Sequence, residues 1–236
     1  MTILCIDSGN TLLKWGLRSG EHWLAQGAVA HREAAQLQLP KRTTRLVACN
    51  VAGDSGRNAI EAIARSCDLT VTWVAARKQQ CGVTSLYDPP EQLGADRWAA
   101  LVGARSIHAG DCVVVMCGTA TTIDILDADG VFNGGLILPG LDMMRNALAD
   151  STADLPPGRG EFRDLPRNTF DAITSGAIHA TLGAIERLTQ HMNGAAAPLC
   201  LLSGGAAMVL APHMALPHRY VENLVLDGVA RIAAAI

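Results

Sequence analysis

Residues 3–29, ILCIDSGNTLLKWGLRSGEHWLAQGAV, contain three β-prone stretches separated by two turn signals. The stretches are Ile3–Ile6, Leu12–Leu17 and His22–Val29, and the turns are Asp7-Ser8-Gly9-Asn10 and Gly20. Short apolar runs bounded by Gly, Asn, Asp and Ser are typical of consecutive strands joined by tight turns. The start of the chain therefore predicts an antiparallel three-strand meander.

The second half of the chain repeats this plan. Cys112–Cys117, Thr122–Leu126 and Val131–Leu138 predict a second three-strand meander, with turns at Gly118-Thr119 and at residues 127–130. Each meander is followed by helical periodicity and further short strands. The further elements expected are strands at Leu46–Val51, Val71–Ala75, Leu199–Leu202 and Arg219–Glu222, and helices at Ser55–Cys67, from about Ala95, from about Leu141, Ser175–His191 and Val225–Ala235.

This duplicated order predicts an α/β fold with two domains, 1–110 and 111–236, and a boundary near Gly110. Two such units with a cleft between them would bring Gly-rich strand ends together, where ligands collect in open α/β sheets. The segment Ser151–Asn168 is rich in Pro, Gly and charge, and it predicts a long loop or flap.

Composition excludes several classes of protein. The chain has 236 residues with 49% hydrophobic residues and a net charge of −3, which is typical of a folded domain and argues against a nucleic-acid-binding surface. We do not expect the first residues, MTILCIDSGN, to form a signal peptide, and no apolar run in the sequence is long enough to span a membrane. The seven cysteines have no C-x-x-C spacing, so we expect neither a disulfide scaffold nor a zinc site, and we expect a cytoplasmic protein.

Two turns could hold phosphate. Asp7-Ser8-Gly9-Asn10-Thr11, with Lys14 beyond it, follows a buried strand, so its N–H groups suit phosphate oxygens and its Asp suits Mg²⁺ through water. Cys117-Gly118-Thr119-Ala120 offers a glycine and a hydroxyl in a similar position. An ordinary β-turn is the favoured explanation of either segment when it is taken alone.

Two further clusters are candidates for a functional role, one through its charged side chains and one through its glycines. In Gly94-Ala95-Asp96-Arg97, the Asp and Arg fall in the first turn of the expected helix, where an Asp can cap the helix or accept a substrate proton. Gly134-Gly135 with Pro139-Gly140, and later Ser203-Gly204-Gly205, allow close backbone approach or simply end strands.

The order of these motifs is more informative than any one of them. Asp-x-Gly-Asn-Thr, Gly-x-Asp-Arg-x-x-Ala, Gly-Thr-Ala-x-Thr and Gly-Gly-x-Ile-x-Pro-Gly follow one another along the whole chain, and this order resembles the type III pantothenate kinases. The resemblance implies two ribonuclease H-like domains of the acetate and sugar kinase/Hsc70/actin superfamily, with mixed sheets flanked by helices and ATP in the cleft between them. It implies ATP-dependent phosphorylation of pantothenate, the first step of coenzyme A biosynthesis, by a homodimer.

The resemblance also implies residue roles. Asp96 is the expected general base, and Asp7 is expected to organise Mg²⁺, through water. The residues expected to contact ATP are Asp7, Ser8, Gly9, Asn10, Thr11, Lys14, Gly118 and Thr119. Those expected to contact pantothenate are Tyr87, Gly94, Ala95, Asp96, Arg97 and Thr169, the last of which can serve a neighbouring subunit. Alternation along the strand alone leaves Lys14 equally free to point to solvent.

One residue departs from the family pattern. Many members carry an Asp three residues before the threonine of Gly-Thr-Ala, and it binds K⁺ or NH₄⁺, whereas this chain has Met116 there. A thioether is a poor ligand for such a cation. Two alternatives to the pantothenate kinase reading stay open: a kinase of another small alcohol on the same fold, and a non-catalytic nucleotide-sensing regulatory or accessory protein.

Overall fold

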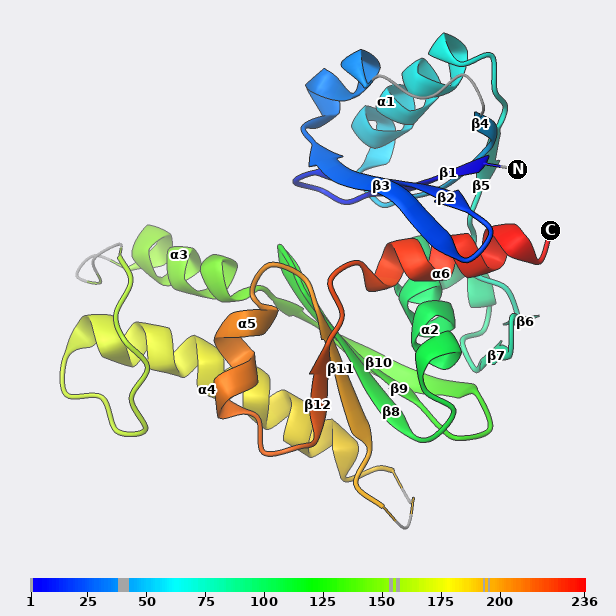
Figure 1. The fold of residues 1–236 in the computed structure, drawn as a ribbon. Coiled ribbons are helices and arrows are strands. Elements are labelled where there is room, and N and C mark those ends of the chain that lie inside the picture. The colour runs from blue at the N-terminus through cyan, green and yellow to red at the C-terminus, as the bar shows by residue number, and fades with distance from the viewer. Residues whose placement is uncertain (1, 38–42, 153–154, 156–157, 193, 195) are drawn as a thin grey trace. The chain divides into compact units, whose positions relative to one another are not determined.

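A computed structural model describes residues 2–37, 43–152, 155, 158–192, 194 and 196–236 (Figure 1). The chain divides into two compact units. Unit 1 comprises residues 1–109, 130–132 and 223–236, and unit 2 comprises residues 110–129 and 133–222. The predicted division into domains 1–110 and 111–236 stays a prediction. In the structure, the last helix belongs to unit 1.

Unit 1 is built on a five-stranded mixed sheet in the order β3-β2-β1-β4-β5. Its strands are β1 (Thr2–Ser8), β2 (Leu13–Ser19), β3 (His22–Val29), β4 (Thr43–Asn50) and β5 (Val71–Trp73). β1, β2 and β3 pair antiparallel in sequence order, which confirms the first predicted meander. β4 pairs parallel with β1 and with β5, so the ends of β1 and β4 lie side by side.

Helices cover both faces of this sheet (Figure 1). α1 (Gly53–Ser66) turns Ile60, Ile63 and Ala64 onto an apolar core that it shares with the 3₁₀ helix η1 (His31–Gln36) and with β1, β2 and β4. α2 (Ala95–Ile107) and α6 (Leu224–Ala234) pack against each other and also contact β4. All three α-helices were predicted from their apolar periodicity.

Short elements of unit 1 escaped prediction. β6 (Gln79–Gln80) and β7 (Val83–Ser85) pair with each other, and β7 pairs parallel with Val131–Phe132 at the start of β10 (Val131–Pro139). The 3₁₀ helix η2 (Pro90–Gln92) precedes α2. Elements of two or three residues are too short to show a periodic pattern.

Unit 2 contains the strands β12 (His218–Tyr220), β11 (Leu199–Ser203), β8 (Cys112–Cys117) and β9 (Ala120–Leu126), followed in sheet order by β10. β8 and β9 are antiparallel, and β9 neighbours β10, which confirms the second predicted meander. β11 pairs parallel with both β8 and β12. Each unit therefore contains mixed β-sheet flanked by helices, as expected.

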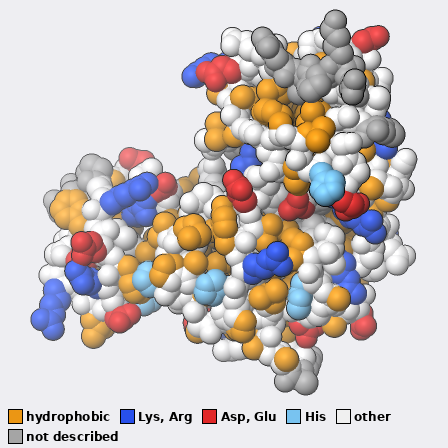
Figure 2. Space-filling model, viewed as in Figure 1, with side chains coloured by type: hydrophobic (Ala, Val, Ile, Leu, Met, Phe, Trp, Pro, Cys, Tyr) orange, Lys and Arg blue, Asp and Glu red, His pale blue; other side chains and the backbone are white. Residues whose placement is uncertain are grey.

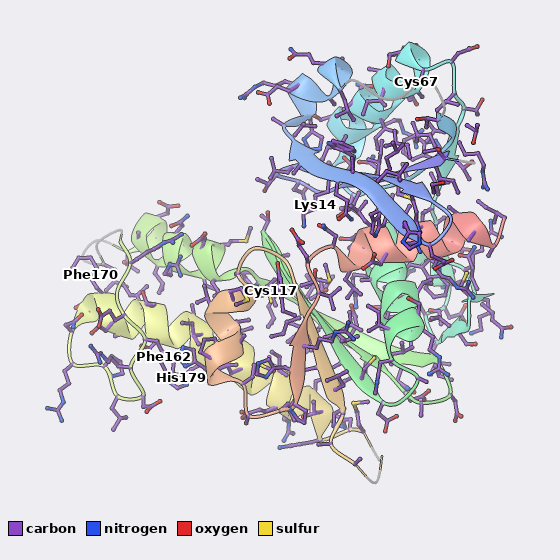
Figure 3. All side chains as sticks on the ribbon, in the orientation of Figure 1. Lys14, Cys67, Cys117, Phe162, Phe170 and His179 are labelled. Carbon is purple, nitrogen blue, oxygen red and sulfur yellow. The ribbon has the colours of Figure 1, made fainter. Side chains whose placement is uncertain are left out.

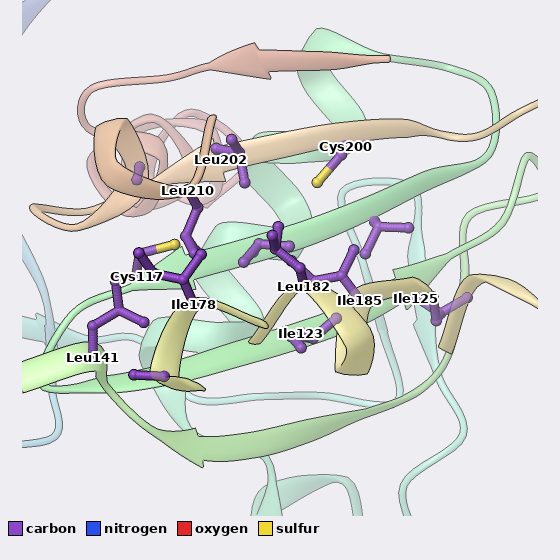
Figure 4. Packing of buried hydrophobic residues seen from close by; sticks show 14 residues of the cluster. Cys117, Ile123, Ile125, Leu141, Ile178, Leu182, Ile185, Cys200, Leu202 and Leu210 are labelled. Atoms are coloured by element: carbon purple, nitrogen blue, oxygen red, sulfur yellow. The ribbon is translucent and has the colours of Figure 1, made fainter. Parts of the chain in front are cut away.

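The core of unit 2 lies between this sheet and its helices (Figure 4). Ile178, Leu182 and Ile185 of α4 (Thr169–Thr189) pack on Val113, Val115 and Ile123 of the sheet. α3 (Leu141–Ser151) adds Leu141, and α5 (Ala207–Leu210) adds Ala207 and Leu210. The 3₁₀ helix η3 (Ala211–His213) follows α5.

α4 begins at Thr169 rather than at Ser175, because Asn168 caps it. The Asn168 side chain accepts a hydrogen bond from Asp171 N at 2.9 Å and donates one to Asp171 Oδ2 at 2.8 Å. An exposed first turn carries no apolar periodicity, so the sequence pattern showed only the buried part of the helix.

The predicted loop 151–168 runs alongside α4 where the structure describes it; residues 153–154 and 156–157 lie outside the described residues. Gly160 N donates to Thr174 Oγ1 at 2.8 Å, and Arg163 N donates to Ser175 Oγ at 2.9 Å. The Phe162 ring lies beside His179 with the ring centroids 5.1 Å apart (Figure 3).

Three general features bear on function. Among the helices that the structure describes, none combines the length and apolarity needed to cross a bilayer. All seven cysteines are free thiols. On the face shown in Figure 2, Lys and Arg side chains are interspersed with acidic ones.

Candidate active site

The carboxylate of Asp7 lies near the end of β1, between residues of two neighbouring strands. The register pairs Asp7 with Lys14 on β2 and with Cys49 on β4. Directly paired residues project from the same face of a sheet, so Lys14 shares its face with Asp7 (Figure 3 shows its position). The Cys49 thiol donates to Asp7 Oδ1 at 3.4 Å.

The surroundings of Asp7 oppose its ionisation. Burial raises the pKa of Asp7 from 3.8 to about 6; the Cys49 hydrogen bond lowers this pKa, the Asp96 carboxylate raises it, and Lys14 lowers it. Asp96 therefore lies near enough within unit 1 for its charge to raise the pKa of Asp7. Two carboxylates held together at a partly buried position are typical of a site that binds a cation.

Hydrogen bonds of Ser8 and Gly9 fix the turn after Asp7. Ser8 is fully buried, and its hydroxyl lies 3.1 Å from His31 Nε2, while its carbonyl accepts a hydrogen bond from Val51 N at 3.0 Å. Gly9 N donates to Leu12 O at 3.2 Å, which closes the turn. Asn10 and Thr11 are exposed. Because the Ser8 side chain is engaged with His31, this residue offers a ligand its backbone rather than its hydroxyl.

Gly56 on α1 lets this helix approach the same turn. A Cβ at Gly56 would lie 2.2 Å from Asn50 Oδ1 and 2.3 Å from Ser8 Oγ. Sequence reasoning missed Gly56, His31 and Cys49. The one available signal was a glycine inside the first turns of a predicted helix, where glycine is unfavourable unless packing requires it.

Asp96 occupies the first turn of α2, as predicted. Its Oδ1 accepts a hydrogen bond from Arg97 N at 2.8 Å, so a helix N–H fixes the carboxylate. A Cβ at Gly94 would lie 2.7 Å from the same Oδ1 atom, which explains why a glycine precedes Asp96. Ala95 is the first residue of the helix.

Arg97 lies in an aromatic pocket with Tyr87. It is only 5% exposed, and its Nη1 donates to the Tyr87 hydroxyl at 3.3 Å. Its guanidinium carbon lies 5.8 Å from the ring centroids of both Tyr87 and Phe132, which are 5.2 Å from each other. Phe132 was not predicted, because it reaches this pocket from β10, far away in the sequence.

The second predicted phosphate turn, Gly118-Thr119, lies between β8 and β9 in unit 2. Both residues are exposed, and Gly118 N donates to Ala120 O at 3.0 Å. Two glycines from other predicted clusters pack against its backbone. A Cβ at Gly140 would lie 2.3 Å from Gly118 O, and one at Gly204, where φ is +98°, would lie 2.4 Å from Cys117 O. Gly140 and Gly204 therefore both lie against the Gly118-Thr119 turn.

Met116 lies on β8 just before this turn. It pairs with Thr122 across β9 and with Ser203 on β11. The hydroxyls of Thr121 and Thr122 are buried and have no hydrogen-bond partner among the described residues. Asp124 is fully buried and pairs with Val114, two residue pairs further from the turn than Met116 and Thr122. Position 116 itself therefore presents a neutral thioether to its neighbours.

Thr169 is the first residue of α4 in unit 2 and is exposed. The structure thus brings Asp7, Lys14 and Asp96 together in one part of unit 1, and Tyr87 and Arg97 together in a pocket of the same unit. Gly118, Thr119 and Thr169 belong to unit 2.

Known proteins are similar to this chain in sequence and in fold. A model of the type III pantothenate kinase family matches residues 3–191. A type III pantothenate kinase from Aromatoleum aromaticum is 48% identical over 235 residues, which cover 98% of this chain and 97% of the relative. This match and the family model cover the motifs that first suggested the resemblance.

Solved structures show the same fold at lower identity. A protein from Campylobacter jejuni described as a Baf family transcriptional activator aligns with a TM-score of 0.68 at 21% identity, over 98% of both chains. One from Listeria monocytogenes described as an N-acetylmannosamine kinase gives 0.58 at 11% identity, over 100% of this chain and 99% of its own. These likenesses confirm the fold predicted for the superfamily. The family model and the full-length identity together show that this chain belongs to the type III pantothenate kinase family.

Proposed function

We propose that this chain transfers the γ-phosphoryl group of ATP to the primary hydroxyl of pantothenate, the first step of coenzyme A biosynthesis. The observation that carries the proposal is the pair of neighbouring carboxylates: Asp96, held by a helix N–H, and Asp7, with Lys14 at its side. Together they supply a proton acceptor and a cation-organising group, the two functions that phosphoryl transfer to an alcohol needs.

Asp96 acts as the general base. The hydroxyl oxygen of pantothenate attacks the γ-phosphorus, the bond to the β,γ-bridging oxygen breaks, and the hydroxyl proton passes to the Asp96 carboxylate. In a loose transition state the proton leaves late, so a carboxylate is a sufficient base. The hydrogen bond from Arg97 N keeps one oxygen of Asp96 occupied and fixes the orientation of the other.

Asp7 suits Mg²⁺ held through water. Mg²⁺ keeps several of its waters and binds through one or two carboxylates together with substrate phosphates. Asp7 is a partly buried carboxylate with a second carboxylate nearby, and a cation would relieve the repulsion between them. When bound, Mg²⁺ would neutralise charge on the phosphates, and Lys14 would add a positive charge beside it.

The two turns account for the ATP contacts. We assign the phosphates to the backbone of residues 7–11, to Lys14, and to Gly118 with Thr119. The exposure of Asn10 and Thr11 in the first turn, and of Gly118 and Thr119 in the second, supports this assignment. Pantothenate would contact Gly94, Ala95, Asp96 and Arg97, with Tyr87 beside the guanidinium and Thr169 as a further contact.

The monovalent cation that the family resemblance implies does not fit position 116. The thioether of Met116 carries no charge, and its cross-strand neighbour Thr122 offers only a hydroxyl. The carboxylate of Asp124 lies two residue pairs further from the turn. The proposed reaction therefore has no step that needs K⁺ or NH₄⁺.

We also propose that the enzyme is a homodimer in the cytoplasm, with Thr169 serving the neighbouring subunit's site. The exposure of Thr169 and the seven free thiols support these two points. Mixing two inactive variants, Asp96→Asn and Thr169→Arg, tests the shared site. Heterodimers regain activity if Thr169 acts across the interface, and the mixture stays inactive if both residues serve the same subunit.

A panel of acceptors tests the reaction itself. Purified enzyme with ATP and Mg²⁺ should form ADP only when pantothenate is present, and ³¹P NMR should show the phosphoryl group on its primary hydroxyl. Faster turnover with another small alcohol would reassign the substrate. Binding of ATP without turnover on any acceptor would instead support a regulatory protein.

A further inference from the structure

The mechanism leaves unused a buried thiol that contacts its metal-organising carboxylate. Cys49 lies on β4 beside Asp7 on β1, in direct register, and its Sγ is 3.4 Å from Asp7 Oδ1. The Cys49 side chain is fully buried, whereas Asp7 is partly exposed. One oxygen of the carboxylate is therefore held from inside the unit.

The thiol is the donor in this contact, because an ionised carboxylate can only accept a hydrogen bond. A thiol is a weak donor, but inside a protein even a weak hydrogen bond restricts the rotation of a carboxylate. Sheet pairing fixes the backbones of both residues, so this bond acts on the side-chain torsion of Asp7.

We propose that Cys49 is a positioning residue: its S–H group holds Asp7 Oδ1 so that the carboxylate presents a single orientation to the hydrated Mg²⁺ of the substrate complex. This inference rests on the role proposed above for Asp7. Groups that orient a metal-organising carboxylate contribute substantially to metal affinity although they never touch the metal.

Three variants separate positioning from packing. Cys49→Ser keeps a donor at the same position, Cys49→Ala removes it, and Cys5→Ala is the matched control. Cys5 is another fully buried thiol, on β1, and it pairs with Val47 rather than with a carboxylate. Wild-type turnover with pantothenate, measured first, tests the proposed function independently of Cys49.

We expect Cys49→Ala to raise the Mg²⁺ concentration for half-maximal rate about tenfold, with the KM for pantothenate unchanged. Cys49→Ser should stay within about twofold of wild type, since it keeps the donor, and Cys5→Ala should match wild type. A Mg²⁺ dependence in Cys49→Ala equal to that of Cys5→Ala would overturn the proposal. So would a Cys49→Ser variant as impaired as Cys49→Ala.

An infrared measurement tests the hydrogen bond without turnover or metal. The S–H stretching band of Cys49 is identified as the band that disappears in Cys49→Ser, and it moves to lower frequency when the thiol donates. In Asp7→Ala the acceptor is absent, so we expect this band to move to higher frequency. An unchanged frequency in Asp7→Ala means that the thiol does not hold Asp7 and contradicts the proposal, whatever the variants do in the assay.

Discussion

At the scale of single residues, the ionised carboxylate of Asp7 destabilises the folded protein when no ligand is bound. Asp7 is a partly buried carboxylate beside the charge of Asp96, and only Lys14 and the Cys49 thiol offset this. Functional sites commonly keep such unfavourable charges because the charges bind the substrate and the cation. This destabilisation should be measurable as a lower free energy of unfolding in the absence of ligand.

Asp7→Asn should therefore stabilise the ligand-free protein at pH 7.5. The pKa of Asp7 is raised to about 6 in the folded state, so the folded protein loses stability as the pH rises through that value. The neutral amide avoids this loss, which is on the order of 1–3 kcal/mol. Urea unfolding at pH 7.5 and at pH 4 checks this: the advantage should be present at the first pH and nearly absent at the second. An equal difference at both values would contradict the electrostatic explanation.

Because Met116 replaces the usual Asp, we expect the activity of this enzyme not to depend on a monovalent cation. Rates in K⁺ and Na⁺ buffers of equal ionic strength should agree within about twofold, because a thioether is a poor ligand for either ion. Met116→Asp should create K⁺ dependence and also a K⁺-specific rise in melting temperature. A large K⁺ activation of the wild-type enzyme would show that other residues bind the cation.

At the scale of elements, glycines fix how the helices meet the site. The Gly94 position leaves room for the carboxylate of Asp96, and Gly56 leaves room for the turn after Asp7. The order of the motifs singled out Gly94 only as an expected contact of pantothenate, so the room that it leaves for Asp96 was not predicted. The role of Gly56 was not predicted either, since it depends on the contact of α1 with Ser8 and Asn50 in the folded chain.

Gly94→Ala should lower kcat by roughly one to two orders of magnitude, because the added Cβ lies 2.7 Å from Asp96 Oδ1 and displaces that carboxylate. Gly176→Ala on α4 is the control, since a Cβ there meets nothing within 4 Å. Steady-state kinetics and melting temperatures of both variants check this. Normal kcat in a folded Gly94→Ala enzyme would show that the Asp96 orientation is unimportant.

Gly228→Ala should destabilise unit 1 by about 2–3 kcal/mol. A Cβ at Gly228 on α6 would lie 1.7 Å from Ala99 O on α2, so the two helices must separate to accept it. Thermal unfolding checks this against Gly183→Ala, whose Cβ meets nothing within 4 Å. Equal melting temperatures for the two variants would mean that the helix contact is not tight.

At the scale of the whole molecule, regular elements were predictable and long-range pairings were not. Alternating and helical apolar patterns located both meanders and the longer helices, because these patterns depend on local geometry. The neighbours of Asp7 and Arg97 could not be predicted from the sequence. A parallel strand pairing brings Cys49 beside Asp7, and Phe132 reaches Arg97 from β10. The return of α6 to unit 1 is likewise a property of the tertiary fold.

The central claim is that Asp96 is the base for phosphoryl transfer to pantothenate, and Asp96→Asn tests it most directly. Phosphopantothenate formation and ATP binding should be measured side by side for this variant and the wild type. We predict that kcat falls by roughly 10²–10⁴ while ATP affinity and melting temperature stay near wild type. A folded Asp96→Asn enzyme that turns over at the wild-type rate would contradict the account.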